Sequence, residues 1–330
     1  MSDGQAWWRC AWSSGCRGHC STNIHRTDQS SDGRCPGRGL ALAGRGYACP
    51  VTAVGNALSR IDTWGAEHAA AMVVGPRGVI ATHGDAGHDY RWASVTKLAT
   101  ALAVLVAVEG GLIDLDESAG PPGSTVRHLL AHASGLPFEG SEPIADPGRR
   151  RIYSNPGFDI LGSLVGDRTG TAFDVALGVS VLGPLGMHGT RLLERPSQGL
   201  HGPLDDLGSL ACELMRPSLV PAGLFAVATT VAFPGLVGVL PGVGRFDPLD
   251  WGLGFELRDG KTPHWTGTRN SPATFGHFGG AGTFLWVDPA VGLALAVLTD
   301  REFGPWSLEA WPALSDAVLG AAAEAEVADR

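Results

Sequence analysis

Charged residues are scarce in this sequence: they make up 17% of its 330 residues, whereas about 25% is average. Apolar residues reach 44%, which is ordinary for a folded protein. A disordered chain combines many charges with few apolar residues, and the composition here is the opposite. The sequence therefore predicts a folded protein with one large globular unit or two smaller ones.

A long hydrophobic run is also missing. The longest strongly apolar stretch covers residues 98–108 and ends at Glu109, while a membrane-spanning helix needs roughly 20 apolar residues. We therefore predict no transmembrane segment. Positive charge is in deficit as well, because the formal net charge is −9, and an acidic molecule is repelled by phosphate backbones. We expect no nucleic-acid partner.

Cysteine is almost absent after residue 49. Of the 6 cysteines in the chain, only Cys212 lies beyond that position. The five others lie in the first 50 residues, which also carry six arginines and three aspartates and show no periodicity. This change in composition predicts a boundary. Residues 1–50 form a leader, which we expect to be disordered, and residues 51–330 form the folded domain.

The leader contains no apolar core followed by a small-residue cleavage site, so we find no secretory signal and expect a cytoplasmic protein. One alternative reading of this segment is a structural zinc site at Cys16, His19 and Cys20, with His25 and Cys35 nearby, although these residues lack the paired spacings of zinc sites. Another is that the basic leader tethers the protein or binds a partner.

Apolar periodicity in the rest of the chain predicts an α/β (α+β) fold. Helices are expected at residues 54–64, 94–109, 126–132, 158–167, 172–182, 207–215 and 306–323, and strands at 70–75, 79–82, 252–257, 283–287 and 293–298. Strands at both ends of the chain most economically share one antiparallel sheet flanked by helices, and the helical middle forms a second lobe. The glycine- and proline-rich stretch 231–250 is expected to be a loop near the site.

Lysine is the scarcest charged residue, because Lys97 and Lys261 are the only two among 24 basic residues. Ser94 and Lys97 begin an apolar helix three residues apart, so their side chains share one face about 5–6 Å apart. A serine hydroxyl is a weak nucleophile until a base takes its proton. Burial and the helix dipole lower the pKa of a lysine enough for it to act as that base, which arginine cannot do. Such a pair also arises by chance, so further motifs are needed.

Two further segments supply them. Residues 153–155 read Y-S-N before a helix, and residues 277–279 read H-F-G before a glycine-rich turn and a strand. Together with Ser94 and Lys97, in this order, they resemble the serine β-lactamase and penicillin-binding-protein superfamily. Within it the sequence is similar to class C β-lactamases and their relatives among D-peptidases and esterases, in which Y-x-N replaces S-D-N.

The resemblance covers about residues 52–326. Residues 126–137 look like the family's R-H-L-L-x-H-x-S-G-L segment, and residues 283–299 look like its closing hairpin. The resemblance implies a β-lactamase/transpeptidase-like fold, with an antiparallel sheet flanked by helices plus a helical lobe, and a site between the two parts.

The resemblance also implies a role for each motif residue. Ser94 would be the acylated nucleophile, and Lys97 would accept its proton. Tyr153 would share proton transfer as a second general base, and a phenol beside a cation would have a lowered pKa that lets it activate water. Asn155 would hydrogen-bond the substrate's amide or the lysine.

The third motif would line the other side of the site. His277, Gly279 and Gly280 belong to or follow the strand there, and glycines let a substrate approach closely. The family binds its oxyanion with two backbone N–H groups, which here are those of Ser94 and Gly280.

Three other candidates are set aside. The run Lys261-Thr262-Pro263 looks like the family's K-T-G, but a proline in the third position disturbs a strand edge. His128 and His132 lie in a segment whose role in the family looks structural, so we leave them out of the site.

The histidine of the third motif bears on the substrate. An imidazole is mostly neutral at pH 7, so His277 would hold a substrate carboxylate less well than the lysine of K-T-G enzymes. We therefore expect a serine hydrolase of small-molecule esters or small amides. The alternatives are a β-lactamase or D-Ala-type peptidase, and a catalytically inactive relative that binds a ligand. No motif implies a metal or an organic cofactor, and none indicates an oligomeric state.

Overall fold

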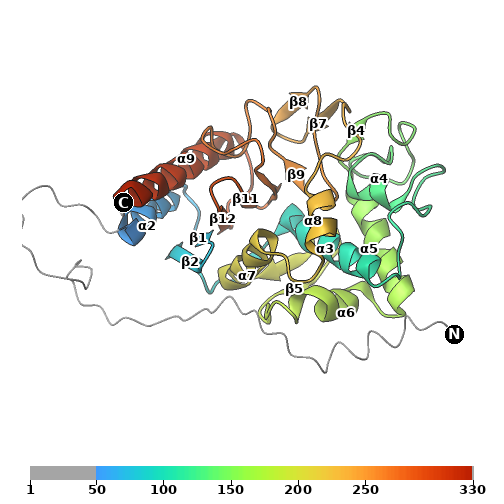
Figure 1. Cartoon of the computed structure of the whole chain (residues 1–330), viewed down its shortest axis with the longest axis horizontal. Helices are drawn as coiled ribbons and strands as arrows, with labels where there is room; N and C mark the ends of the chain where they lie inside the picture. The colour runs from blue at the N-terminus through green and yellow to red at the C-terminus, as the bar shows by residue number, and fades with distance from the viewer. Residues whose placement is uncertain (1–49, 329–330) are drawn as a thin grey trace, which may run out of the picture.

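The computed structural model describes residues 50–328 (Figure 1). Residues 1–49 of the expected leader, including the three residues weighed as zinc ligands, lie outside the described residues. None of the helices in the described part combines the length and the apolarity that a membrane span requires.

Strands from both ends of the chain form one sheet, as predicted, and this sheet has six strands. Its order is β2-β1-β12-β11-β10-β9, and each neighbouring pair is antiparallel. Residue pairs from Ala69↔Thr299 to Val74↔Ala294 fix the register between the first strand and the last. The strands are β1 (Ala69–Gly75), β2 (Gly78–Gly84), β9 (Glu256–Leu257), β10 (Phe275–Gly279), β11 (Thr283–Asp288) and β12 (Leu293–Thr299).

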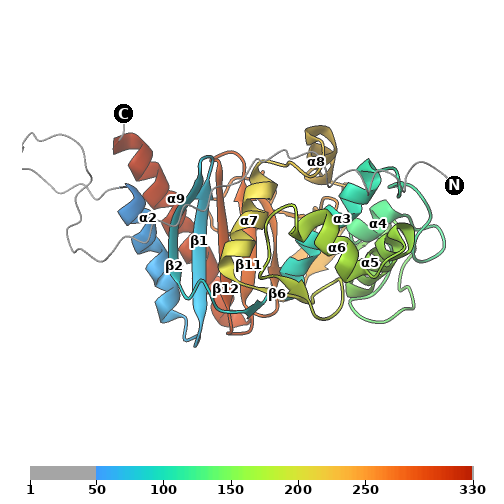
Figure 2. The ribbon, with the colours of Figure 1, turned by 90° about the horizontal axis from the view of Figure 1, so that it is seen from below.

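Helices cover both faces of the sheet (Figure 2). The terminal helices α2 (Pro50–Leu58) and α9 (Pro305–Ala328) pack side by side on one face, and α7 (Leu204–Met215) packs on the other. Because both faces are covered, β11 and β12 are buried along their whole length. They therefore read as continuous apolar runs rather than as alternating patterns.

The helical lobe is built around α3 (Thr96–Glu109), most of whose residues are buried on every side. Against it pack α5 (Asn155–Thr169), α6 (Phe173–Leu177) and a π-helical turn at Gly178–Leu182, and α4 (Val126–Leu130) packs on α5. A further short helix, α8 (Ala222–Ala228), follows α7 in the chain. Two small three-stranded sheets complete the fold: β3 (Tyr90–Arg91) with β6 (Leu200–Gly202) and β5 (Arg191–Leu192), and β4 (Arg151–Ile152) with β7 (Gly238–Leu240) and β8 (Gly244–Phe246).

Two local predictions were wrong. The expected loop at 231–250 contains the β7–β8 hairpin, whose turn includes Gly242 at φ 74°. Gly238 has no side chain, and a Cβ there would lie 2.3 Å from the carbonyl oxygen of Arg151, so β7 can approach β4. In the expected strand 252–257 only Glu256–Leu257 pairs in the main sheet, because Gly254 at φ 95° interrupts the extended backbone.

Candidate active site

Ser94 lies in a short 3-10 turn, η2 (Ala93–Val95), that runs directly into α3. The residue before it, Ala93, has a φ of 47°, a left-handed conformation that costs energy for a residue with a side chain. Packing holds it there, because Trp92 is fully buried and its indole donates a hydrogen bond to the carbonyl oxygen of Gly202 at 3.1 Å. Ser94 itself is half-buried.

Lys97 is fully buried one turn further along α3. Its Nζ lies 3.2 Å from the Oγ of Ser94, 2.6 Å from the Oδ1 of Asn155 and 2.8 Å from the carbonyl oxygen of Ser197. Burial lowers the pKa of Lys97 to about 7, although nearby carboxylates oppose the shift. A substantial fraction of the molecules therefore carries Lys97 as a neutral amine at pH 7, and this amine can take a proton from the hydroxyl beside it.

Tyr153 precedes α5, and its ring centroid lies 4.8 Å from the Nζ of Lys97. Burial raises the pKa of Tyr153, and a hydrogen bond with Ser94 only partly opposes that shift. The expectation of a lowered pKa for this phenol was therefore wrong. The physical reason is that the phenol is deeply buried, and Lys97 is not a permanent cation beside it. At pH 7 Tyr153 holds its proton and can donate it.

The third motif reaches the same place from the sheet. The imidazole of His277 on β10 lies 5.6 Å from the ring of Tyr153, centroid to centroid, and its Nδ1 donates to the carbonyl oxygen of Phe278 at 2.6 Å. Burial, reinforced by the charge of Lys97, lowers the pKa of His277 to about 3. This imidazole is neutral at pH 7, in line with the expectation.

The two glycines of this motif differ in their surroundings. A Cβ on Gly279 would lie 2.5 Å from the carbonyl oxygen of Trp92, so the strand can run beside the Ser94 turn only because no side chain is present. Gly280, just after β10, is exposed and has open space where a side chain would be. The fold therefore brings all seven predicted site residues into one region around η2, the start of α5 and the end of β10.

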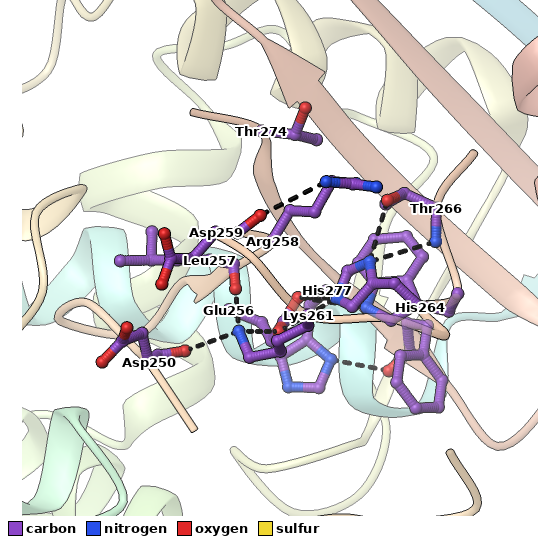
Figure 3. Close-up of polar contacts among 12 residues, drawn as sticks. Asp250, Glu256, Leu257, Arg258, Asp259, Lys261, His264, Thr266, Thr274 and His277 are labelled. Carbon is purple, nitrogen blue, oxygen red and sulfur yellow. Dashed lines mark hydrogen bonds and ion pairs between the residues drawn. The ribbon is translucent and has the colours of Figure 1, made fainter. Parts of the chain in front are cut away.

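Lys261 is not available to a substrate (Figure 3). Its side chain is buried, and its Nζ lies 2.7 Å from the Oε1 of Glu256 and also donates to the carbonyl oxygens of Asp250 and Leu257. Although burial alone would raise the pKa of Glu256, the charges of His264 and Lys261 hold it at about 2. The second lysine of the chain is therefore committed to a buried ion pair.

Two residues outside the predicted site also contact this region. Glu139 accepts a hydrogen bond from the Nδ2 of Asn155 at 2.7 Å, and no local pattern connects two residues 16 positions apart. His132, which was set aside as structural, has its ring centroid 4.5 Å from that of Tyr153, and its Nδ1 accepts the N–H of Ser154 at 3.1 Å. Its position within the 126–137 motif was the available signal.

One group of metal-ligand types occurs in the described part of the chain, at the edge of the sheet. The candidate ligand atoms of His68, Asp85 and His88 all lie within 4.8 Å of one another. The two imidazoles are stacked, however, with ring centroids 3.9 Å apart and planes 13° from parallel. Lone pairs of stacked rings do not converge on one ion, so one ring would have to rotate before this group could bind a metal.

The chain is similar to known proteins in sequence and in fold. A family model described as "Beta-lactamase" matches residues 64–319. Esterase EstB of Burkholderia gladioli is 27% identical over 324 residues, which cover 69% of this chain and 81% of the esterase. Penicillin-binding protein 4* of Bacillus subtilis is 27% identical over 139 residues, but this match spans only 31% of that protein and 32% of this chain.

A solved structure is more similar. A β-lactamase from Mycobacterium bovis is 54% identical, and the alignment covers 80% of this chain and 98% of that one with a TM-score of 0.79. The two proteins therefore share their fold over most of this chain.

Proposed function

The chain belongs to the beta-lactamase family, and we propose that it is a serine hydrolase of the class C type that acts through an acyl-enzyme on Ser94. The observation that carries this proposal is the pair of side chains at the start of α3. A buried amine with a pKa of about 7 lies 3.2 Å from a half-buried hydroxyl, which is the arrangement that makes an alcohol nucleophilic at neutral pH.

In the first step, the Oγ of Ser94 attacks the carbonyl carbon of the substrate while its proton passes to the Nζ of Lys97. The N–H groups of Ser94 and Gly280 donate to the resulting oxyanion. When the intermediate collapses, the carbon–oxygen bond of the ester breaks, and the leaving alkoxide takes a proton from Tyr153. The ammonium of Lys97 then restores the proton of Tyr153. The products of this step are an alcohol and the acyl-enzyme.

In the second step, water attacks the acyl carbonyl. Its proton passes to Lys97 through Tyr153, so the two residues act as general bases together. The acid is released as the proton returns to the Oγ of Ser94. A phenol with a raised pKa suits this relay, because Tyr153 does not persist as a phenolate between the two steps and so keeps a proton to donate.

The charges around the site support an ester or a small amide as the substrate. His277 is neutral, and Lys261 is held by Glu256, so neither supplies a cation to a substrate carboxylate. Asn155, His277, Gly279 and Gly280 would contact the substrate. The similarity to esterase EstB supports the same choice.

A second candidate is β-lactam hydrolysis. It is favoured by the 54% identity to the β-lactamase from Mycobacterium bovis. The acyl-enzyme chemistry would be the same, with the β-lactam nitrogen as the leaving group.

A substrate panel separates the two. We would measure hydrolysis of p-nitrophenyl acetate and butyrate, D-amino-acid amides and nitrocefin by the wild type, by Ser94→Ala and by the control Ser59→Ala. We expect ester hydrolysis that Ser94→Ala abolishes and Ser59→Ala retains. Rapid nitrocefin hydrolysis without ester hydrolysis would overturn the choice of substrate. Failure of a fluorophosphonate probe to label Ser94 would favour an inactive ligand-binding relative.

We also propose that residues 51–330 form the hydrolase domain and that the leader is dispensable for catalysis. The family match at 64–319 lies within residues 51–330 and leaves the leader outside it, which supports this division. Removal of residues 1–49 should leave ester hydrolysis and solubility intact, and loss of either would contradict this division.

A further inference from the structure

The side-chain amide of Asn155 is held at both ends. Its Oδ1 accepts a hydrogen bond from the Nζ of Lys97 at 2.6 Å, and its Nδ2 donates one to the Oε1 of Glu139 at 2.7 Å. An ionised carboxylate has only acceptors, so it can face the NH2 end of an amide but not the oxygen end. Glu139 therefore decides which end of Asn155 faces Lys97.

We propose that Glu139 is a positioning residue, which keeps the oxygen of Asn155 directed at Lys97 and so leaves the lysine lone pair free for the proton of Ser94. This inference rests on the proposed function, because it concerns the base of that reaction. If the amide were reversed, its NH2 group would donate to the neutral amine and occupy the lone pair. Lys97 would then be unable to act as the base.

Arg195 binds the other oxygen of Glu139. Its Nη1 and Nη2 each lie 3.1 Å from the Oε2 of Glu139, and its Nε and Nη2 donate to the Oδ2 of Asp159 at 2.8 and 2.5 Å. A guanidinium has only donors, so the group at position 139 must present an oxygen to it. A carboxylate has a second oxygen for Asn155. A glutamine would give its single oxygen to Arg195 and turn its NH2 group toward Asn155.

The same charges act on the proton affinity of Lys97. Its pKa is lowered by burial and by Arg195 and raised by Asp159 and Glu139. The other titratable groups that face it, all neutral at pH 7, are His132, Tyr153 and His277. Loss of the Glu139 charge lowers the pKa of Lys97 in any variant, whereas only an NH2 group at position 139 actively favours the reversed amide of Asn155. The two effects can therefore be separated.

The kinetic test compares Glu139→Gln with Glu139→Ala on p-nitrophenyl butyrate, at a pH well above 7. Glutamine has nearly the same shape as glutamate, so a purely steric role predicts that it is tolerated better than alanine. We expect the reverse. The glutamine variant should lose about 100-fold in kcat, because the lone pair of the base is occupied, and the alanine variant less than about 10-fold. KM should change little in either.

A second substitution should rescue the first. In Glu139→Gln combined with Arg195→Ala, the glutamine is free to turn its oxygen toward Asn155, so kcat should rise toward that of the alanine variant. The matched control is Arg191→Ala in the same background. Arg191 pairs with Asp89 at 2.6 Å on the surface and should give no rescue.

A spectroscopic readout does not depend on activity. Because Lys97 and Lys261 are the only lysines, a full-length chain labelled with ¹³C-lysine gives two lysine signals, and titration of the Lys97 signal reports its pKa. We expect the midpoint to fall below that of the wild type in both Glu139 variants. The fall should be larger with glutamine, because a donor on the lone pair further stabilises the neutral amine.

Three results would overturn the proposal: equal kcat losses in the glutamine and alanine variants, no rescue by Arg195→Ala, or a rise in KM with kcat unchanged, which would make Glu139 a substrate-binding group. If the wild type hydrolyses no ester, the proposed function fails instead. The lysine titration still decides in that case, because equal midpoints in the two variants would show that Glu139 acts through charge alone.

Discussion

The hydroxyl of Thr283 on β11 donates a hydrogen bond to the carbonyl oxygen of Trp92 at 2.8 Å. Trp92 lies two residues before Ser94, and Thr283 is fully buried. This contact joins the sheet to the turn that presents the candidate nucleophile, and a residue from the last third of the chain supplies it.

We expect Thr283→Val to lose about 1 kcal/mol of unfolding free energy and to lower kcat for esters, because the turn at Ser94 loses a support. Urea unfolding and steady-state kinetics measure the two effects. Thr169→Val is the control, since Thr169 donates a similar bond to the carbonyl oxygen of Val165 at 2.8 Å at the far end of α5. Equal activity in the two variants would show that the contact with Trp92 is only structural.

The pH dependence of hydrolysis should follow Lys97. Its neutral form is the base, and its pKa is about 7, so kcat/KM should rise with pH through about 7 and then level off. Lys97→Arg should remove most turnover at every pH, because a guanidinium cannot accept the proton. A wild-type profile that is flat between pH 6 and 8 would contradict a general base with this pKa.

The same group affects stability. The pKa of Lys97 is depressed in the folded state from its ordinary value of 10.5 to about 7, so between these two pH values the unfolded chain binds more protons. The contribution of Lys97 to unfolding free energy therefore rises with pH across this window and is constant below about 7. Urea unfolding at pH 7.5 and 9.5 should show a smaller rise for Lys97→Met than for the wild type. An identical rise would mean that burial does not depress this pKa.

The buried ion pair between Glu256 and Lys261 should matter for folding. Glu256→Gln keeps the shape of the side chain but leaves a buried ammonium without its counter-charge, which should cost about 3–5 kcal/mol of unfolding free energy. Asp116→Asn breaks the exposed pair with Arg127 and should cost less than about 1 kcal/mol. Similar losses in the two variants would show that the buried pair is no stronger than a surface one.

The two glycines after His277 should respond differently to a methyl group. Gly279→Ala places a Cβ against the backbone of Trp92 and should cost about 1–3 kcal/mol of unfolding free energy. Gly280→Ala adds its Cβ in open space and should unfold like the wild type. Thermal unfolding of both variants makes the comparison, and a stable Gly279→Ala variant would contradict the close approach of β10 to the Ser94 turn.

The sequence predicted the sheet from local signals, whereas the grouping of the motif residues in one site was implied by the resemblance to the family. Ser94 begins an apolar helix, and Asn155 begins another whose cap, Ser154, accepts the N–H of Gly157 at 3.2 Å. The apolar runs of β11 and β12 identify buried strands directly. The order of the motifs along the chain is itself part of the evidence for that resemblance.

What the sequence did not predict depends on contacts between distant residues. The raised pKa of Tyr153 comes from burial among side chains of other elements, and the bond between Glu139 and Asn155 joins two separate segments. The β7 strand was not predicted because glycines allow a short strand as readily as a loop, and its partner β4 lies 87 positions earlier, as in the pair Arg151↔Gly238. Such contacts appear only when the chain is folded.

Both lysines of the chain lie in the interior, one beside Ser94 and the other against Glu256. Apart from the terminal amine, the intact protein therefore offers amine-directed reagents no accessible target. Acylation of either lysine by such a reagent requires the surrounding structure to open first. The rate of labelling at each lysine would therefore measure how often the structure around that lysine opens.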